Sequence, residues 1–185
     1  MSPATVRHAW LRSVALVAVV ALGGCATPAG QQAMVAQGAP VAAARQHAFS
    51  VSVTVQGGSE TGALDSSNIA NADLKSALET SIRESRLFKE VVQGKGGQYD
   101  LAVSVVQLSK PMFGATFTVD LEAAWSLTRA SDRAVLLRKV IKTSGTATMG
   151  EAFVGVTRLR LAVEAAARSN IQQGLADIAE LDLRP

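Results

Sequence analysis

Apolar and polar residues alternate along four stretches of the chain, which is the pattern of strands with one buried face. These stretches are 49–55, 99–109, 117–128 and a return strand over about 135–148. A hairpin turn over 130–133 separates the last two, and weaker alternation in the return strand indicates a bulge near 138–139. The third stretch is the most regular, and one face of it carries only Phe117, Val119, Leu121, Ala123, Trp125 and Leu127.

Two segments have the spacing of amphipathic helices instead. The first has Leu74, Leu78 and Ile82 on one face, begins after an N-cap at Asn68 or Asn71, and runs to about residue 86. The second covers about 156–181, where the apolar positions are Leu159, Val163, Ala166, Ile171, Leu175 and Ile178.

These elements follow one another as β-α-β-β-β-α, with a further short edge strand expected over 90–92. Strands with one wet face and two amphipathic helices favour an α+β fold. We therefore predict a two-layer sandwich, in which a mostly antiparallel sheet of four or five strands carries both helices on one face. Residues 48–185 are expected to form a single globular domain.

The first 25 residues have a different composition. Arg7 and Arg12 precede an apolar stretch of about ten residues, 13–22, which is too short to span a bilayer. The stretch ends in Leu22-Gly23-Gly24-Cys25, which resembles the lipobox of bacterial lipoproteins. An ordinary secretory signal or an anchor helix, with an incidental cysteine, is the alternative.

The lipobox resemblance implies how the chain is processed and in which membrane it is anchored. In that family the signal peptide, here 1–24, is removed, a diacylglycerol is attached to the sulfur of Cys25, and the new amino terminus is acylated. Two or more acyl chains hold a protein firmly on a membrane. The family retains lipoproteins at the inner membrane mostly through an aspartate after the cysteine. Ala26 and Thr27 stand there instead, so we expect the outer membrane, with the domain facing the periplasm.

Residues 26–47 are rich in Ala, Gln, Gly and Pro, have no periodicity and contain only one charged side chain, Arg45. Such a segment has little apolar surface to offset the cost of ordering. We predict a flexible, lipid-anchored tether over 25–47 that ends in an exposed His47.

Charge and cysteine content exclude several classes of function. The chain of 185 residues has 18 basic and 15 acidic side chains, and without residues 1–24 it has 16 and 15, which gives no support for nucleic-acid binding. The single cysteine excludes an internal disulfide and a multi-cysteine metal site. With Cys25 lipidated and His47 as the one remaining histidine, we expect no metal, no cofactor and no catalytic triad.

Other charged or glycine-rich groups fit ordinary structural roles. Asp120 and Glu122 share one strand face and could form an acid/base pair, but a solvated face is the better interpretation. The glycines within 94–97 lack the spacing of a phosphate loop and precede a strand. The arginines of the last helix are expected to be solvated charges: Arg158, Arg160 and Arg168.

Two loops carry apolar side chains that do not belong to any strand or helix. Met112 and Phe113 follow the second main strand, and Met149, Phe153 and Val154 follow the return strand. An antiparallel meander brings both loops to one end of the sheet, where they either form a tip that binds a partner or lipid, or fold inward to cap the core. If the first strand is parallel to its neighbour, the tether attaches at the opposite end, and the tip faces away from the anchoring membrane.

The order of elements is similar to that of small periplasmic lipoproteins. The outline resembles the lipopolysaccharide-assembly lipoprotein and the auxiliary lipoproteins of lipid-transporting ABC systems, with no shared motif beyond the lipobox. We therefore expect a non-catalytic binding or assembly module, anchored through Cys25, whose partner is an envelope protein complex or lipid. An amphiphile-binding domain with an interior cavity is the alternative, and a carboxylate-dependent hydrolase is a third hypothesis.

Overall fold

The computed structural model describes residues 27–37, 46–62 and 66–185; the predicted signal peptide and Cys25 lie outside these ranges. The elements are, in order, α2 (Gln31–Met34), β1 (His47–Gln56), α3 (Asn71–Ser85), β2 (Phe88–Val92), β3 (Tyr99–Ser109), β4 (Phe117–Arg129), β5 (Val135–Ala147) and α4 (Gly155–Ala179).

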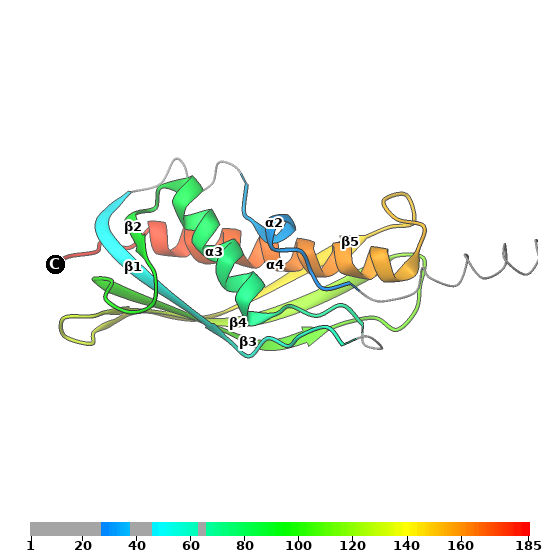
Figure 1. Ribbon diagram of the computed structural model, residues 1–185, viewed down its shortest axis with the longest axis horizontal. Coiled ribbons are helices and arrows are strands. Elements are labelled where there is room, and N and C mark those ends of the chain that lie inside the picture. The colour runs from blue at the N-terminus through cyan, green and yellow to red at the C-terminus, as the bar shows by residue number, and fades with distance from the viewer. Residues whose placement is uncertain (1–26, 38–45, 63–65) are drawn as a thin grey trace, which may run out of the picture.

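The strands form one sheet in the order β2-β1-β3-β4-β5. Strand β1 is parallel to both of its neighbours, whereas β4 is antiparallel to β3 and β5. Helices α3 and α4 lie on one face of this sheet, with α3 over β1 and β2 and α4 over β4 and β5, and the short helix α2 contacts both of them (Figure 1). The predicted α+β two-layer sandwich is confirmed, and the short edge strand, β2, completes the five.

The core lies between the helices and the buried face of the sheet, and α4 on β4 forms a large part of it. All six apolar side chains predicted for the buried face of β4 are at most 7% exposed, and so are those of the helix face from Val163 to Ile178. Trp125 is the largest of them, and its indole N–H donates to Oδ1 of Asn170 at 2.9 Å. Asn170 in turn donates to the carbonyl oxygen of Ile141 at 3.0 Å, so one buried amide joins α4 to both β4 and β5.

Two local expectations need correction. The irregularity of β5 lies at Leu136 rather than near 138–139, because Leu127 pairs with Leu137 while Thr128 pairs with Val135. Neither predicted asparagine caps α3, since the N-cap position is Ala70. The side chain of Asn71 instead accepts a hydrogen bond from the backbone N–H of Gly58 at 2.8 Å, which ties the loop after β1 to the helix.

The predicted tether is not free over residues 27–37, which we call the N-terminal strap. Ala29, Met34 and Val35 are at most 1% exposed, packed in the core cluster beside α3 and α4. Polar contacts hold the strap on both helices: Glu164 accepts from the N–H of Gly30 at 2.8 Å, Arg168 donates to the carbonyl of Ala33 at 2.7 Å, and Ser81 accepts from the N–H of Ala36 at 2.9 Å.

His47 is likewise buried rather than exposed, at 4%. Its Nε2 lies 3.1 Å from the carbonyl oxygen of Ile178, and its ring centroid is 5.4 Å from that of Phe88. It therefore belongs to the packing between β1, β2 and the end of α4. Among the described residues, no helix combines the length and apolarity needed to cross a membrane.

The strap provides a first testable expectation. Glu164 is 5% exposed. Its Oε1 accepts the hydrogen bond from the N–H of Gly30 and also forms an ion pair with Nε of Arg160 at 3.6 Å. A hydrogen bond to a charged group contributes about 2 kcal/mol. Glu164→Ala should therefore lower the free energy of unfolding by about this amount and speed amide exchange at Gly30. Glu84→Ala, at an exposed position of α3, is the control; equal exchange at Gly30 in both variants would contradict the role of Glu164.

Candidate functional site

Two loops meet at one end of the sheet, the one that joins β3 to β4 (110–116) and the one that joins β5 to α4 (148–154). Their ends are adjacent because Phe117, the first residue of β4, pairs with Ala147, the last residue of β5. The predicted juxtaposition of these loops is thus confirmed. Their apolar side chains are referred to below as the apolar tip: Met112, Phe113, Met149, Phe153 and Val154.

The side chains of the apolar tip point outward. Met112, Phe113 and Phe153 are 93%, 86% and 81% exposed, and Met149 and Val154 are about half exposed. The alternative in which these side chains cap the core is therefore wrong. Phe117 and Leu159 close the core beneath them, at 7% and 8% exposure. Exposed apolar side chains gathered in one place are characteristic of interaction surfaces.

Arg158, in the first turn of α4, holds the two tip loops together. Its Nη1 donates to the carbonyl oxygens of Ala152 at 2.8 Å and Phe153 at 3.1 Å, and its Nη2 donates to that of Gly114 at 2.9 Å. The guanidinium also lies 4.7 Å from the ring centroid of Phe117, which is cation–π geometry. Because the bonded carbonyls belong to Phe153 and to the neighbour of Phe113, the arginine fixes the backbone that presents both phenylalanines.

The sequence did not reveal this role. Arg158 was expected to be a solvated charge, but it is 6% exposed. Helical periodicity places an arginine relative to its own helix only, and the acceptors here come from a loop 44 residues away and from the loop before α4. Arg160 and Arg168 were also expected to be solvated, but both donate hydrogen bonds to the N-terminal strap.

An open groove of about 730 Å³ adjoins the apolar tip. Its polar part includes Ser67 and Lys110, whose Nζ donates to Asn68 Oδ1 at 2.6 Å and to the carbonyl of Ser67 at 3.1 Å. Most of the remaining lining is apolar: Leu108, Met112, Phe117, Val156 and Leu159. The groove and the tip together form a largely apolar surface at this end of the domain.

The N-terminal strap begins at this same end. Thr27 accepts a hydrogen bond from Nη1 of Arg160 at 3.1 Å through its hydroxyl, and one from the hydroxyl of Ser67 at 2.8 Å through its carbonyl. At the other end of the strap, the carbonyl oxygen of Gln37 accepts a hydrogen bond from the side-chain amide of Gln172 at 3.4 Å. Twelve helical residues separate the two contacts on α4, about 18 Å at 1.5 Å per residue.

The end of the domain at which the N-terminal segment was expected to attach therefore needs correction. Strand β1 is parallel to β3, as that expectation required, and His47 lies at the opposite end from the tip. However, the chain before β1 does not leave the domain there, because the strap runs back along α4. Thr27, which follows Cys25 by two positions, lies at the tip end.

The paired carboxylates lie on the open face of the sheet, as predicted. Asp120 Oδ1 accepts from the hydroxyl of Ser144 at 2.6 Å, and Glu122 forms an ion pair of 2.6 Å with Lys142. Each carboxylate thus interacts with its cross-strand neighbour on β5. No group of three or more His, Cys, Asp or Glu side chains in the described part of the chain is placed to hold a metal ion.

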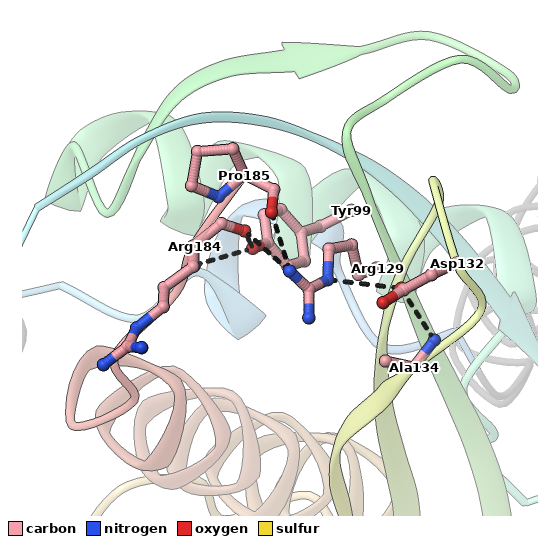
Figure 2. A network of polar contacts seen from close by, with 6 residues as sticks. All are labelled: Tyr99, Arg129, Asp132, Ala134, Arg184 and Pro185. Carbon is pink, nitrogen blue, oxygen red and sulfur yellow. Dashed lines mark hydrogen bonds and ion pairs between the residues drawn. The ribbon is translucent and has the colours of Figure 1, made fainter.

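The opposite end of the sheet has a polar arrangement. Figure 2 shows Arg129 between the turn after β4 and the last two residues: its Nε pairs with Asp132 at 3.2 Å, and its Nη1 donates to the carbonyl of Pro185 at 2.7 Å. The hydroxyl of Tyr99 donates to the carbonyl of Arg184 and accepts from its N–H. The two ends of the domain therefore differ in character, with the apolar surface at the end where Thr27 lies.

No family model and no curated protein sequence matches the chain. Solved structures do resemble it. Protein XCC0632 of Xanthomonas campestris, of the family DUF330, has a TM-score of 0.58 at 14% identity, over 74% of this chain and 87% of that one. The PelC dodecamer of Paraburkholderia phytofirmans has a TM-score of 0.50 at 14% identity, over 75% and 91%. A candidate lipoprotein from Caulobacter crescentus has a TM-score of 0.48 at 14% identity, over 76% and 90%. At such identities the first two likenesses show a common fold.

Proposed function

We propose that this chain is a lipid-anchored lipoprotein of the bacterial outer membrane that faces the periplasm and acts as a non-catalytic binding or assembly module. The observation that carries the proposal is the apolar tip, whose most exposed side chains, Met112, Phe113 and Phe153, are more than 80% exposed. Leaving such side chains in water is unfavourable, so a surface built to present them is suited to a partner.

Three further observations support the proposal. The sequence up to Cys25 has the charge, length and small residues of a lipoprotein signal. The fold is shared with PelC, which was crystallised as a dodecamer. The carboxylates on the open sheet face interact with their cross-strand neighbours, Asp120 with Ser144 and Glu122 with Lys142, which an ordinary solvated face explains.

The proposed anchoring is tested with the full chain expressed in a bacterium that processes lipoproteins. We expect the protein in the outer-membrane fraction, and mass spectrometry should find an acylated N-terminal peptide that begins at Cys25. The variant Cys25→Ala should give neither result. Recovery of the unaltered chain as an unacylated protein in the soluble periplasmic fraction would refute the anchor.

The apolar tip should be dispensable for folding. Because Phe113 and Phe153 are exposed, Phe113→Ser and Phe153→Ser should each change the free energy of unfolding by no more than about 0.5 kcal/mol. Both variants should be lipidated but should lose the partner that copurifies with the crosslinked wild-type protein. Val140→Thr is the control, because Val140 is 51% exposed on the open sheet face.

If Val140→Thr also loses the copurifying partner, the loss is not specific to the tip, and the proposal that the tip binds the partner is refuted. Unfolding of both serine variants would show that the phenylalanines stabilise the domain instead.

The groove beside the tip favours a second candidate, an amphiphile-binding domain. Its apolar lining, from Leu108 to Leu159, and the ammonium group of Lys110 fit an acyl chain with a polar head group. This binding site lies at the surface, whereas the space between α4 and the sheet is filled by Trp125 and its neighbours. A defined lipid in the purified, detergent-washed protein would support this candidate over protein assembly.

A further inference from the structure

We infer that the apolar tip inserts into the surface of the same membrane that holds the lipid on Cys25. This inference rests on the proposed lipidation and names the partner of the tip as a bilayer. In this arrangement the tip end of the domain contacts the membrane. The flexible tether predicted from the sequence would instead hold the domain away from the membrane.

The position of Thr27 is the first step of the argument. Its hydroxyl and carbonyl are bound by Arg160 and Ser67 at the tip end of the domain. Cys25 precedes it by two residues, and an extended chain covers at most about 3.6 Å per residue, or about 7 Å in all. The acyl chains must therefore enter the bilayer close to this end of the domain.

The second step concerns how the tip and the anchor are joined. Arg158 holds the tip loops and Arg160 holds Thr27, and these arginines are two residues apart on the same helix. Glu164 and Arg168 continue the attachment of the strap along α4. Because one helix carries both sets of contacts, the position of Thr27 relative to the tip is fixed as long as the strap stays on α4.

The third step is the composition of the surface that would meet the lipid. In the loops 110–116 and 148–154 only two side chains are charged, Lys110 and Glu151. Lys110 donates a hydrogen bond to the carbonyl oxygen of Ser67 in the groove. Glu151 accepts hydrogen bonds from the N–H and the hydroxyl of Thr148 at 2.8 and 3.0 Å. Phenylalanine and methionine can therefore enter the interfacial region with little charge to remove from water.

The energetic role of such an insertion follows from how lipid anchors work. Acyl chains fix a protein to a membrane but leave its domain free to rotate about the attachment point. A second apolar contact at the same end of the domain acts at a high effective concentration and needs little intrinsic affinity. We therefore expect the tip to set the orientation of the domain rather than its membrane affinity.

Site-specific fluorescence tests this orientation. The chain has one cysteine, which the lipid occupies, so Phe113→Cys and Phe153→Cys each introduce a single reactive thiol at an exposed position of the mature protein. The matched control is Ser131→Cys, in the exposed turn between β4 and β5 at the opposite end. Each lipidated variant is labelled with an environment-sensitive dye and reconstituted into phosphatidylethanolamine–phosphatidylglycerol vesicles, with and without nitroxide-labelled lipid.

The inference predicts strong quenching by the nitroxide lipid at positions 113 and 153, with a blue-shifted emission, and water-like emission with little quenching at 131. Equal, water-like behaviour at all three positions would overturn it, and so would stronger quenching at 131. Acylation of each preparation is verified by mass spectrometry, so a protein that lacks the lipid on Cys25 is recognised as a failure of the proposed anchoring and not of the tip.

Discussion

Gly145→Ala is expected to lower the free energy of unfolding by about 3 kcal/mol or more, because α4 lies directly against β5 at this residue. A Cβ atom at position 145 would lie 2.2 Å from the carbonyl oxygen of Ala162 and 2.2 Å from the backbone nitrogen of Ala166. Both are backbone atoms of a helix, so no side chain can rotate to make room. The helix would have to move away from β5, which would weaken the core around Trp125 that α4 closes.

Urea denaturation of the domain measures this effect, and Gly150→Ala is its control. Gly150 lies in the loop before α4, where an added Cβ would meet only the hydroxyl of Thr148 at 3.6 Å. That variant should stay within about 0.5 kcal/mol of the wild-type stability. Equal stabilities of the two variants would contradict the close packing of α4 on β5.

Arg158→Met should lower stability by about 2 to 3 kcal/mol, since it removes charge-assisted hydrogen bonds to three loop carbonyls while it preserves much of the side-chain volume. It should also loosen both tip loops, and amide exchange over 112–114 and 149–154 should become several-fold faster. Arg158→Lys should be intermediate, because an ammonium group cannot reproduce the planar fork that reaches Gly114 and Phe153 together.

Arg138→Met is the matched control, because Arg138 is exposed on β5. It should change neither the stability nor the exchange of the tip loops appreciably. If Arg158→Met loses stability while exchange in the tip loops stays at the wild-type rate, the arginine supports the core but does not organise the tip.

Period-two and helical patterns predicted most of this fold for a simple physical reason. The sheet has one face against the helices and one toward solvent, so each strand must alternate, and β4 does so from Phe117 to Leu127 without interruption. The same reasoning identified the buried face of α4. It could not locate contacts that depend on how α4 packs on the sheet. Gly145 is an example, because the need for a residue without a side chain there follows only from the close approach of α4.

The N-terminal strap and Arg158 escaped prediction because their partners are distant in sequence. Met34 and Val35 lie in a segment without periodicity, and their burial depends on a surface built by α3 and α4. Arg158 is buried because its donors match carbonyls from two loops. Periodicity in a sequence indicates which face of a helix or strand is buried. It does not indicate which groups of other elements contact that face.

For the candidate site, the meander predicted that the two loops meet, whereas their exposure could not be derived. Phenylalanines at positions 113 and 153 fit a core cap as well as a surface tip, and only the folded structure shows that Phe117 and Leu159 close the core without them. The end at which the N-terminal segment leaves the domain was predicted wrongly, because chain order suggested the start of β1, whereas Thr27 lies at the tip end.

The central claim, that the apolar tip is the contact surface of an anchored lipoprotein, is tested most directly by photocrosslinking in intact cells. A photoreactive phenylalanine analogue replaces Phe113 in the full chain, and a second chain carries it at Val140 on the open sheet face. We predict adducts to lipid or to an envelope protein from position 113, dependent on Cys25, and few from position 140. Adducts from position 140 alone, or the same adducts after Cys25→Ala, would contradict the claim.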